Sequence, residues 1–222
     1  MERALGVLLG ASGPRGVPVT VAGRTDAGVH AIGQVCSYEG EAVRVRALNA
    51  LLAPDVAALS CEPAADGFDA RRDATSRAYC YRVLARRARS PLLAGRALHW
   101  PHAVSMALLE RCAAALEGVH DFTAFTPTET EHVRFEREVL FARWRREGDQ
   151  LVFLIEADAF LRHMNRVLVG TMLQVAAGRR SVESFVELLG GRPRSQSGPT
   201  AAACGLYLVG VGYGGERVLP AV

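Results

Sequence analysis

The stretch VPVTVAGRTDAGVHAIGQVCSY, residues 17–38, places a polar segment between two strand-like runs, residues 17–21 and 34–38. The polar segment, residues 22–35, contains an aspartate, an arginine, a threonine, a histidine and three glycines. Glycine permits positive φ and a close approach of the backbone to a ligand. A hairpin needs only two or three turn residues and no charge, so this segment indicates more than a chain reversal.

Asp26 is the acidic residue of this segment, and its residue type leaves two interpretations open. Most aspartates in turns only hydrogen-bond the local backbone, whereas a carboxylate beside an arginine and a histidine can also act in catalysis. The sequence GRTDAGVHA, residues 23–31, resembles the active-site motif of the tRNA pseudouridine synthase A family. The resemblance implies that Asp26 is the catalytic aspartate and that Arg24 and His30 position the RNA.

The composition is that of a soluble globular chain, since 50% of the 222 residues are hydrophobic and 22% are charged. No run of about 18 uncharged apolar residues occurs, and the opening MERALGVLLG resembles neither a signal peptide nor a membrane anchor. A cytoplasmic protein without membrane contact is therefore expected. The five cysteines form no CxxC or Cys/His pair, which argues against a zinc site and a disulfide framework and predicts free thiols.

All 26 basic residues are arginine, although the formal net charge is only +3. We attribute the absence of lysine mainly to a genome rich in G and C, because Ala, Gly and Val are also in excess. The arginines gather in two stretches, which favours nucleic acid only slightly over solvated strand edges. The stretches contain Arg71, Arg72, Arg77, Arg82, Arg86, Arg87 and Arg89, and then Arg134, Arg137, Arg143, Arg145 and Arg146.

Hydrophobic periodicity and turn residues predict interspersed helices and strands. Because hairpins outnumber βαβ units, the sequence predicts an α+β fold with a mostly antiparallel sheet. A border near residues 90–95 predicts an N-terminal half, residues 1–92, that carries the aspartate segment and a C-terminal half, residues 93–222, that completes the site. Helices are expected at residues 2–10, 42–52, 105–117, 159–177 and 182–189, and strands at 17–21, 34–38, 56–62, 75–84, 97–100, 139–145, 151–156 and 206–211.

Four later segments, residues 68–81, 118–125, 159–171 and 197–213, extend the family resemblance in the same order. The resemblance implies the pseudouridine synthase fold, in which two related α+β halves share one sheet. Helices then pack on one side of that sheet, and an RNA-binding cleft lies at its middle. Because the family works as a homodimer on tRNA, tRNA and a second copy of the chain are the expected partners.

If residues 75–84 are extended, Arg77, Tyr79 and Tyr81 face one side of the sheet. An arginine beside tyrosines can hold a phosphate and stack a base, although tyrosines also fill half-buried sheets well. The resemblance implies that Tyr79 is the active-site tyrosine, which packs on the target base and is a candidate to move its proton. Arg77, and Arg71 in the same matched segment, are predicted to bind RNA.

The helix expected at residues 159–177 carries Arg166 one turn before Gly170, which leaves room for another backbone or a ligand. A surface arginine on an amphipathic helix is the alternative. The resemblance implies that Arg166 pairs with Asp26 and favours the charged carboxylate, and that Arg162 on the same side binds RNA. The N-cap is expected at Asp158, and the buried stripe at Leu161, Met164, Leu168 and Met172.

Two further candidates are His120 and Leu206. The step from His120 to Asp121 can act as acid and base, but at a helix end it more often serves capping and turn chemistry. By resemblance, the loop of His120 shapes the RNA cleft and Leu206 is an apolar wall for the bound base. Residues 206–211 are otherwise an ordinary hydrophobic strand.

The resemblance implies isomerisation of uridine to pseudouridine at positions 38 to 40 of the anticodon stem-loop of tRNA. Since the reaction only moves a glycosidic bond from N1 to C5, neither a metal nor a cofactor is expected. A non-catalytic RNA-binding protein is the alternative, because the family's opening strand and DG and GWQ-like loop are missing from this sequence. A glycosidase would need a second placed carboxylate and a phosphotransferase a phosphate-binding signature, and neither is evident.

Overall fold

The structure, a computed structural model, describes residues 1–11, 13, 16–130 and 133–220. Contacts divide the chain into two compact units. The first comprises Met1–Arg24 and Val35–Ala74, and the second comprises Thr25–Gln34 and Thr75–Val222. The predicted division into related halves, residues 1–92 and 93–222, concerns kinship between segments rather than contacts, and it stays a prediction.

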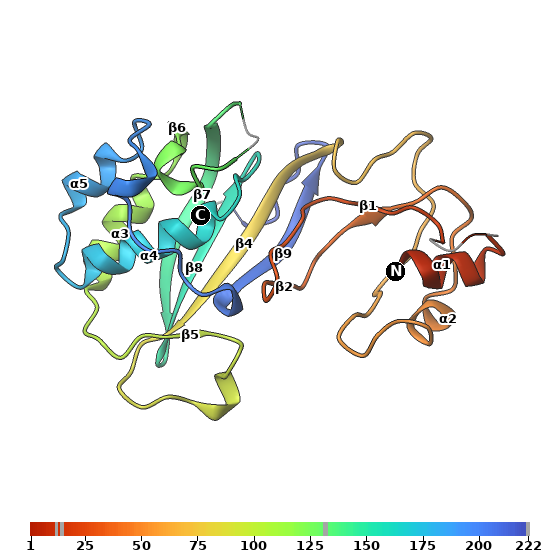
Figure 1. The fold of residues 1–222 in the computed structure, drawn as a ribbon, viewed down its shortest axis with the longest axis horizontal. Coiled ribbons are helices and arrows are strands. Elements are labelled where there is room, and N and C mark those ends of the chain that lie inside the picture. Colours follow the sequence, from red (N-terminus) through yellow and green to blue (C-terminus); the bar gives the residue numbers. More distant parts are fainter. Residues whose placement is uncertain (12, 14–15, 131–132, 221–222) are drawn as a thin grey trace. The chain divides into compact units, whose positions relative to one another are not determined.

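The described part of the first unit contains two short helices and a two-stranded ladder (Figure 1). The helices are α1 (Glu2–Leu8) and α2 (Val45–Asn49), and the strands are β1 (Thr20–Val21) and β3 (Cys36–Ser37). β1 and β3 pair antiparallel, which confirms the two strands predicted around the polar segment, although each is only two residues long. The core of this unit contains Ala4, Leu5, Val17 and Leu48.

The prediction of a strand at residues 56–62 is wrong, because these residues are irregular. The side chain of Asn49 binds the backbone of this segment at Ala58. Its Nδ2 donates to the carbonyl of Ala58 at 2.9 Å, and Ala58 N donates back to Asn49 Oδ1 at 2.7 Å. One amide side chain thus satisfies the donor and the acceptor that a strand would otherwise pair.

A seven-stranded sheet forms the centre of the second unit within the described residues. Its strands are β2 (His30–Ala31), β4 (Ala74–Leu84), β5 (Leu98–His99), β6 (Gly118–Asp121), β7 (Glu136–Glu147), β8 (Gln150–Ala157) and β9 (Leu206–Tyr213). They follow the order β2-β9-β4-β8-β7-β6, with β5 on β4. The long neighbours β4, β8 and β7 pair antiparallel, as do β7 and β6, whereas β2–β9 and β4–β5 are parallel. The predicted α+β class is confirmed.

The hairpin of β7 and β8 follows directly from the sequence pattern. Gly148 adopts φ +58° at the turn, a conformation that favours glycine. The register places Trp144 opposite Phe153, and their rings stack in the core at 5.0 Å. In contrast, the sequence pattern does not predict β2 and β6, because edge strands of two and four residues are too short to show a period.

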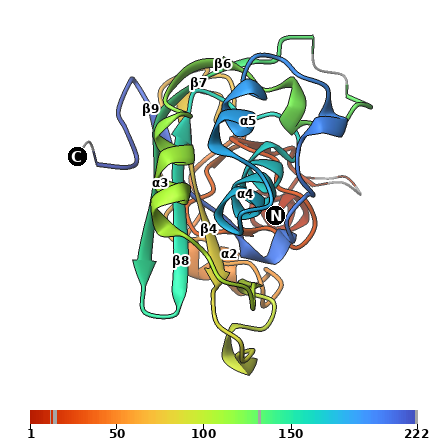
Figure 2. The same ribbon diagram turned by 90° about the vertical axis from the view of Figure 1, so that its left-hand side faces the viewer.

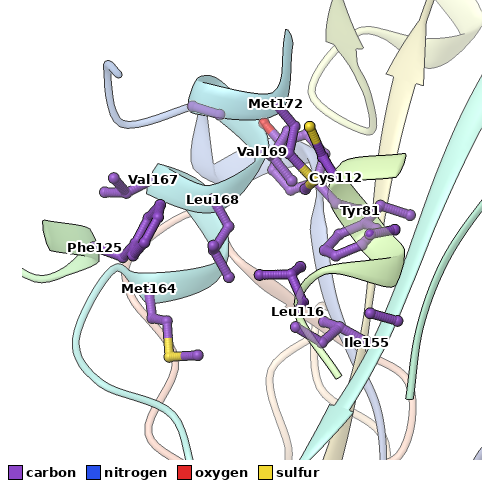
Figure 3. Close-up of a cluster of buried hydrophobic side chains, with 14 of the residues drawn as sticks. Tyr81, Cys112, Leu116, Phe125, Ile155, Met164, Val167, Leu168, Val169 and Met172 are labelled. Atoms are coloured by element: carbon purple, nitrogen blue, oxygen red, sulfur yellow. The ribbon is translucent and has the colours of Figure 1, made fainter. Parts of the chain in front are cut away.

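Three helices, α3 (Met106–Ala114), α4 (Met164–Ala176) and α5 (Val182–Glu187), lie on one face of this sheet (Figure 2). Figure 3 shows side chains of α4 packed against Tyr81 of β4 and Cys112 of α3 in the main core. Because α4 is enclosed in this way, it is buried around most of its circumference. Among the described residues, 3₁₀ turns form at Pro91–Leu93, Thr123–Phe125, Arg194–Gln196 and Ala203–Gly205.

α4 begins at Met164 rather than at Ala159, and Asp158 is not its N-cap, so both predictions are wrong. Oδ1 of Asp158 accepts instead from Ala159 N at 2.6 Å and from Glu138 N at 3.1 Å, which ties the end of β8 to β7. The N-cap position belongs to His163, which is left-handed at φ 61°. The predicted buried stripe is confirmed at Leu161, Met164, Leu168 and Met172.

The five cysteines are free thiols, of which Cys80 and Cys112 are buried. Among the described residues no helix is both long enough and apolar enough to span a membrane. The same residues contain no group of three or more His, Cys, Asp or Glu side chains that could hold a metal ion.

Candidate active site

Asp26 lies in a tight turn that leads into β2. Its carbonyl accepts a hydrogen bond from Val29 N at 3.0 Å, and Gly28 adopts φ +81°. The third position of such a turn needs positive φ, which accounts for the glycine. Because β2 is the edge strand that pairs with β9, this pairing anchors the turn at that edge of the sheet.

Arg166 extends from α4 and pairs with Asp26. Its Nη1 donates to Oδ2 of Asp26 at 2.8 Å, and its Nε donates to the carbonyl of Ala201 at 2.8 Å. The Arg166 side chain is 17% exposed and the Asp26 side chain 33%. Partial shielding from water strengthens a charge pair, so the pairing implied by the family resemblance is present and oriented by a second hydrogen bond.

Gly170 allows the segment at residues 198–201 to lie directly on α4. A Cβ at Gly170 would overlap the carbonyl oxygen of Pro199, so the predicted room for another backbone is confirmed. At the next residue of α4, the buried Thr171, Oγ1 accepts a hydrogen bond from Gly198 N at 2.9 Å. These contacts fix the backbone whose Ala201 carbonyl orients Arg166.

Arg194 secures the same segment from its other side. Its Nη1 donates to Oγ of Ser197 at 2.8 Å and to the carbonyl of Gly198 at 3.0 Å, and its Nη2 donates to Thr200 Oγ1 at 3.2 Å. Burial lowers the pKa of this guanidinium from its ordinary value. Arg194 is absent from the sequence-predicted site, because a single arginine in a Pro/Arg/Ser-rich loop shows no periodic signal.

His163 approaches the same carboxylate oxygen as Arg166. Its Nε2 lies 3.3 Å from Asp26 Oδ2, and its side chain is 24% exposed. Burial lowers the pKa of His163 most, while the charge of Asp26 acts in the opposite direction. The sequence prediction missed this residue, although its place three residues before Arg166 could have indicated a shared side.

Tyr79 lies on the helix-covered face of β4 and is 7% exposed. The ring of Phe160 meets it edge-on at 4.9 Å. Burial raises the pKa of Tyr79 to about 12, against the lowering effect of Arg77, and the charge of Asp26 raises it further. The phenol is therefore neutral near pH 7 and lies within electrostatic reach of Asp26.

Three other predicted residues also belong to the second unit. Arg77 Nη1 donates to the carbonyl of Asp158 at 3.1 Å. Arg162 is exposed, and its charge acts on His163. Leu206 is 7% exposed and belongs to the main core. The structure thus gives two cations whose charges act on Tyr79 and His163, and a place for Leu206 at the bound base stays a prediction.

Two predicted histidines have other surroundings. His30 stacks on Tyr207 at 4.6 Å, and its Nε2 is 3.0 Å from the carbonyl oxygen of Gly95. His120 lies on β6, at the opposite edge of the sheet from β2, with its Nε2 3.1 Å from the carbonyl oxygen of Glu117. The structure does not bring His120 to Asp26, and a role for either histidine in RNA binding stays a prediction.

Arg24 and Arg71 belong to the first unit. Both are exposed, and Arg71 N donates to Oδ1 of Asp69 at 2.8 Å. Their contacts with RNA also stay predictions.

Comparison with known proteins matches this arrangement to one family. A family model described as tRNA pseudouridine synthase matches residues 112–214. The tRNA pseudouridine synthase A of Chromobacterium violaceum is 40% identical to this chain, over 99% of the chain and 85% of that protein. The protein of the same name from Myxococcus xanthus is 41% identical, over 96% of the chain and 81% of its own length. The tRNA pseudouridine synthase A of Aeromonas salmonicida is 38% identical, over 92% of the chain and 78% of its own length.

The chain belongs to the tRNA pseudouridine synthase A family. As a member, it is an isomerase of the pseudouridine synthase class, which confirms the resemblance carried by residues 23–31 and the four later segments. In this member of the family, the aspartate of the GRTDAGVHA motif, an arginine of α4 and a tyrosine of β4 form one group.

Proposed function

We propose that the protein isomerises uridine to pseudouridine in the anticodon stem-loop of tRNA, at positions 38 to 40, with Asp26 as the reacting carboxylate and without a cofactor. One observation carries the role of Asp26. Arg166 donates to one of its oxygens at 2.8 Å, while the carboxylate side chain stays one-third exposed. A cation at this distance stabilises the negative charge, and the exposure leaves the carboxylate accessible to a substrate.

The chemistry requires a single ionised carboxylate. It can attack C1′ of the ribose or C6 of the base, or it can accept a proton in a route through an eliminated sugar. In each route the bond between C1′ and N1 breaks, the base turns over, and a bond between C1′ and C5 forms. The proton lost from C5 balances the proton gained by N1, so no oxidant, reductant or group donor takes part.

In this proposal the target base leaves its helical stack and enters the site beside Tyr79. Stacking on an aromatic ring offsets part of the cost of unstacking. Because the Tyr79 phenol is neutral, it can pack on an uncharged base without placing a second anion beside Asp26. Leu206 supplies an apolar wall, and Arg77 and Arg162 supply phosphate contacts.

The proposal includes a cytoplasmic homodimer, in keeping with the family resemblance. Sedimentation at the working enzyme concentration tests this part. A monomer under conditions in which tRNA is modified would remove the dimer from the proposal.

The central test compares wild-type protein with Asp26→Asn on uridine-labelled tRNA, followed by an assay for pseudouridine and mapping of its position. The wild type is expected to form pseudouridine at positions 38 to 40. Asp26→Asn is expected to bind the tRNA but to form no pseudouridine. Activity retained by the variant would sink the assignment of Asp26, and product at other positions would change the substrate.

A further inference from the structure

Ala201 holds Arg166 at two points. Its carbonyl accepts a hydrogen bond from Nε of Arg166 at 2.8 Å, and its N donates to the carbonyl of Arg166 at 3.0 Å. The guanidinium is planar, so the bond from Nε restricts the direction of Nη1, which donates to Oδ2 of Asp26 at 2.8 Å. The way in which Arg166 meets Asp26 therefore depends on where the backbone at Ala201 lies.

The next residue, Ala202, is held by a tyrosine of the sheet. The hydroxyl of Tyr81, on β4, donates to the carbonyl of Ala202 at 2.7 Å. Ala202 has φ −57° and ψ 141°, close to the values of polyproline II, and the carbonyls of Ala201 and Ala202 accept from different side chains. Tyr81 is thus bonded one peptide unit away from the carbonyl that orients Arg166.

Tyr81 is itself fixed in the core. Its side chain is fully buried and belongs to the cluster that Figure 3 shows. A Cβ at Gly205 would overlap its ring, so the segment after Ala202 packs on the ring as well as on the hydroxyl. Burial raises the pKa of Tyr81, and the charge of Arg166 acts in the opposite direction. The phenol therefore keeps its proton near neutral pH and stays a donor.

We propose that Tyr81 is a positioning residue, which holds the carbonyl of Ala202, thereby places the carbonyl of Ala201, and so directs Arg166 toward Asp26. This inference rests on the proposed role of Asp26. Arginine has several rotatable bonds, and fixing its direction in advance removes that cost from the reaction. A small misplacement of a charged group can lower a rate strongly, so a buried hydroxyl at a distance from the substrate can affect the reaction.

The first variant is Tyr81→Phe, which removes the hydroxyl and keeps the ring in the core. Single-turnover rates and tRNA affinity are measured at one pH, and the rates are corrected for the folded fraction. We expect the rate to fall about tenfold, which is the scale of one net hydrogen bond, with tRNA affinity within about twofold of wild type. A purely structural tyrosine would lower stability and leave the rate of the folded fraction unchanged.

The coupling between Tyr81 and Arg166 separates positioning from structural support. A double-mutant cycle combines Tyr81→Phe with Arg166→Gln. Glutamine carries no cation to direct toward Asp26, so the place of the Ala201 carbonyl no longer matters there. Tyr81→Phe should then lower the rate by less than about twofold, against about tenfold when Arg166 is present. Independent effects would give the same factor in both backgrounds.

A rescue and a matched control complete the experiment. Site-specific 4-aminophenylalanine at residue 81 returns a neutral N–H donor in place of the hydroxyl, and it should restore the rate to within about threefold of wild type. If Tyr81→Phe does not fold, 4-fluorophenylalanine replaces it, because fluorine fills the space without donating. Tyr38→Phe is the control, since it removes a hydroxyl that donates to the carbonyl of Glu41 at 2.9 Å in the first unit. Its rate per folded molecule should equal that of wild type.

Three results would overturn the inference: a wild-type rate in Tyr81→Phe, the same loss with and without the guanidinium of Arg166, or a rate that 4-aminophenylalanine does not restore. Failure of the proposed function has a different signature. It would appear as a wild-type protein that forms no pseudouridine, or as an active Asp26→Asn. Normal wild-type activity, an inactive Asp26→Asn and an unaffected Tyr81→Phe would reject the role of Tyr81 alone.

Discussion

Asp26 and Glu156 are two carboxylates of the second unit that have opposite surroundings. Glu156, on β8, is fully buried. It accepts from Ser76 Oγ at 2.5 Å and from the backbone amides of Val218 and Leu219 at 2.9 Å each, so that both of its oxygens are used. These donors are neutral, and they attach the segment after β9 to the sheet.

Asp26 differs from Glu156 in exposure, in the charge of its donors and in their distribution. It is one-third exposed, and its cationic partner Arg166 binds one oxygen. A fully buried carboxylate whose two oxygens both accept from fixed donors can stabilise a fold but is not accessible to a substrate. The comparison teaches that exposure, the charge of the donors and an oxygen left open together distinguish a carboxylate that can react from a structural one.

The same chemical change at the two carboxylates should have opposite results, and the largest effect is expected at Asp26. Asp26→Asn removes the charge and nucleophilicity while keeping the size, so the single-turnover rate should fall about 10³-fold or more. Its free energy of unfolding should change by less than about 1 kcal/mol, because partly exposed ion pairs contribute little. Rate measurements and urea unfolding on the same preparation check both parts. A large loss of stability would make Asp26 structural, like Glu156.

Arg166 is the next strongest test, since it supplies the asymmetry at Asp26. Arg166→Gln removes the cation from Oδ2 and should lower the rate about 10²-fold, which is the scale of a hydrogen bond to a charged group. Arg166→Lys keeps the charge but loses the Nε hydrogen bond to the carbonyl of Ala201. Its rate should therefore lie between those of wild type and Arg166→Gln. Arg179→Gln, an exposed arginine after α4, serves as the control. Equal rates in Arg166→Gln and wild type would contradict the asymmetry.

A third, smaller effect is expected at Glu156. In Glu156→Gln one oxygen becomes an amide that faces a backbone N–H, so one buried donor loses its acceptor. This should lower the free energy of unfolding by about 1–3 kcal/mol, while the rate per folded molecule stays at the wild-type value. Urea unfolding and an active-fraction titration with tRNA separate the two quantities. A loss of rate without a loss of stability would place Glu156 in the reaction.

Sequence predicted the parts of the fold that depend on local periodicity. Residues 75–84 alternate with period two, and β4 has the predicted faces, with Tyr79 and Tyr81 in the core. The pattern failed where a distant or non-periodic contact decides the structure. Within residues 56–62, the side chain of Asn49 binds both backbone groups of Ala58, and no local signal shows that an amide side chain will do so.

The residues of the candidate site could be predicted from the sequence only where they belong to a motif of the resembled family. The pair of Asp26 and Arg166 was reached through the family resemblance, since 140 residues separate the two in the chain. His163 was missed because it approaches Asp26 from a left-handed backbone position before α4, which a helical period extended from residue 159 hides. Glu156 was missed as well, because its partners belong to the segment after β9, and only the folded chain brings them together.

Tyr79 gives the smallest expected effect and tests whether the neighbourhood of Asp26 is desolvated. Its pKa is about 12 in the fold against about 10 in an unfolded chain. Below pH 10 the phenol is protonated in both states, and its contribution to stability is fully present. Between pH 10 and about 12 the unfolded chain ionises first, so this contribution is lost as the pH rises.

Tyr79→Phe removes this titration, and the comparison is clean because the chain contains no lysine to titrate in the same range. Between pH 9 and pH 11 the wild type should lose on the order of 1 kcal/mol more free energy of unfolding than Tyr79→Phe. The other tyrosines are common to both proteins and cancel in the difference. Urea unfolding at the two pH values measures it. Equal losses would mean that water reaches the phenol in the folded protein. The side of the site that is proposed to bind the base would then be hydrated, and the surroundings of Asp26 would differ even more from those of the buried Glu156.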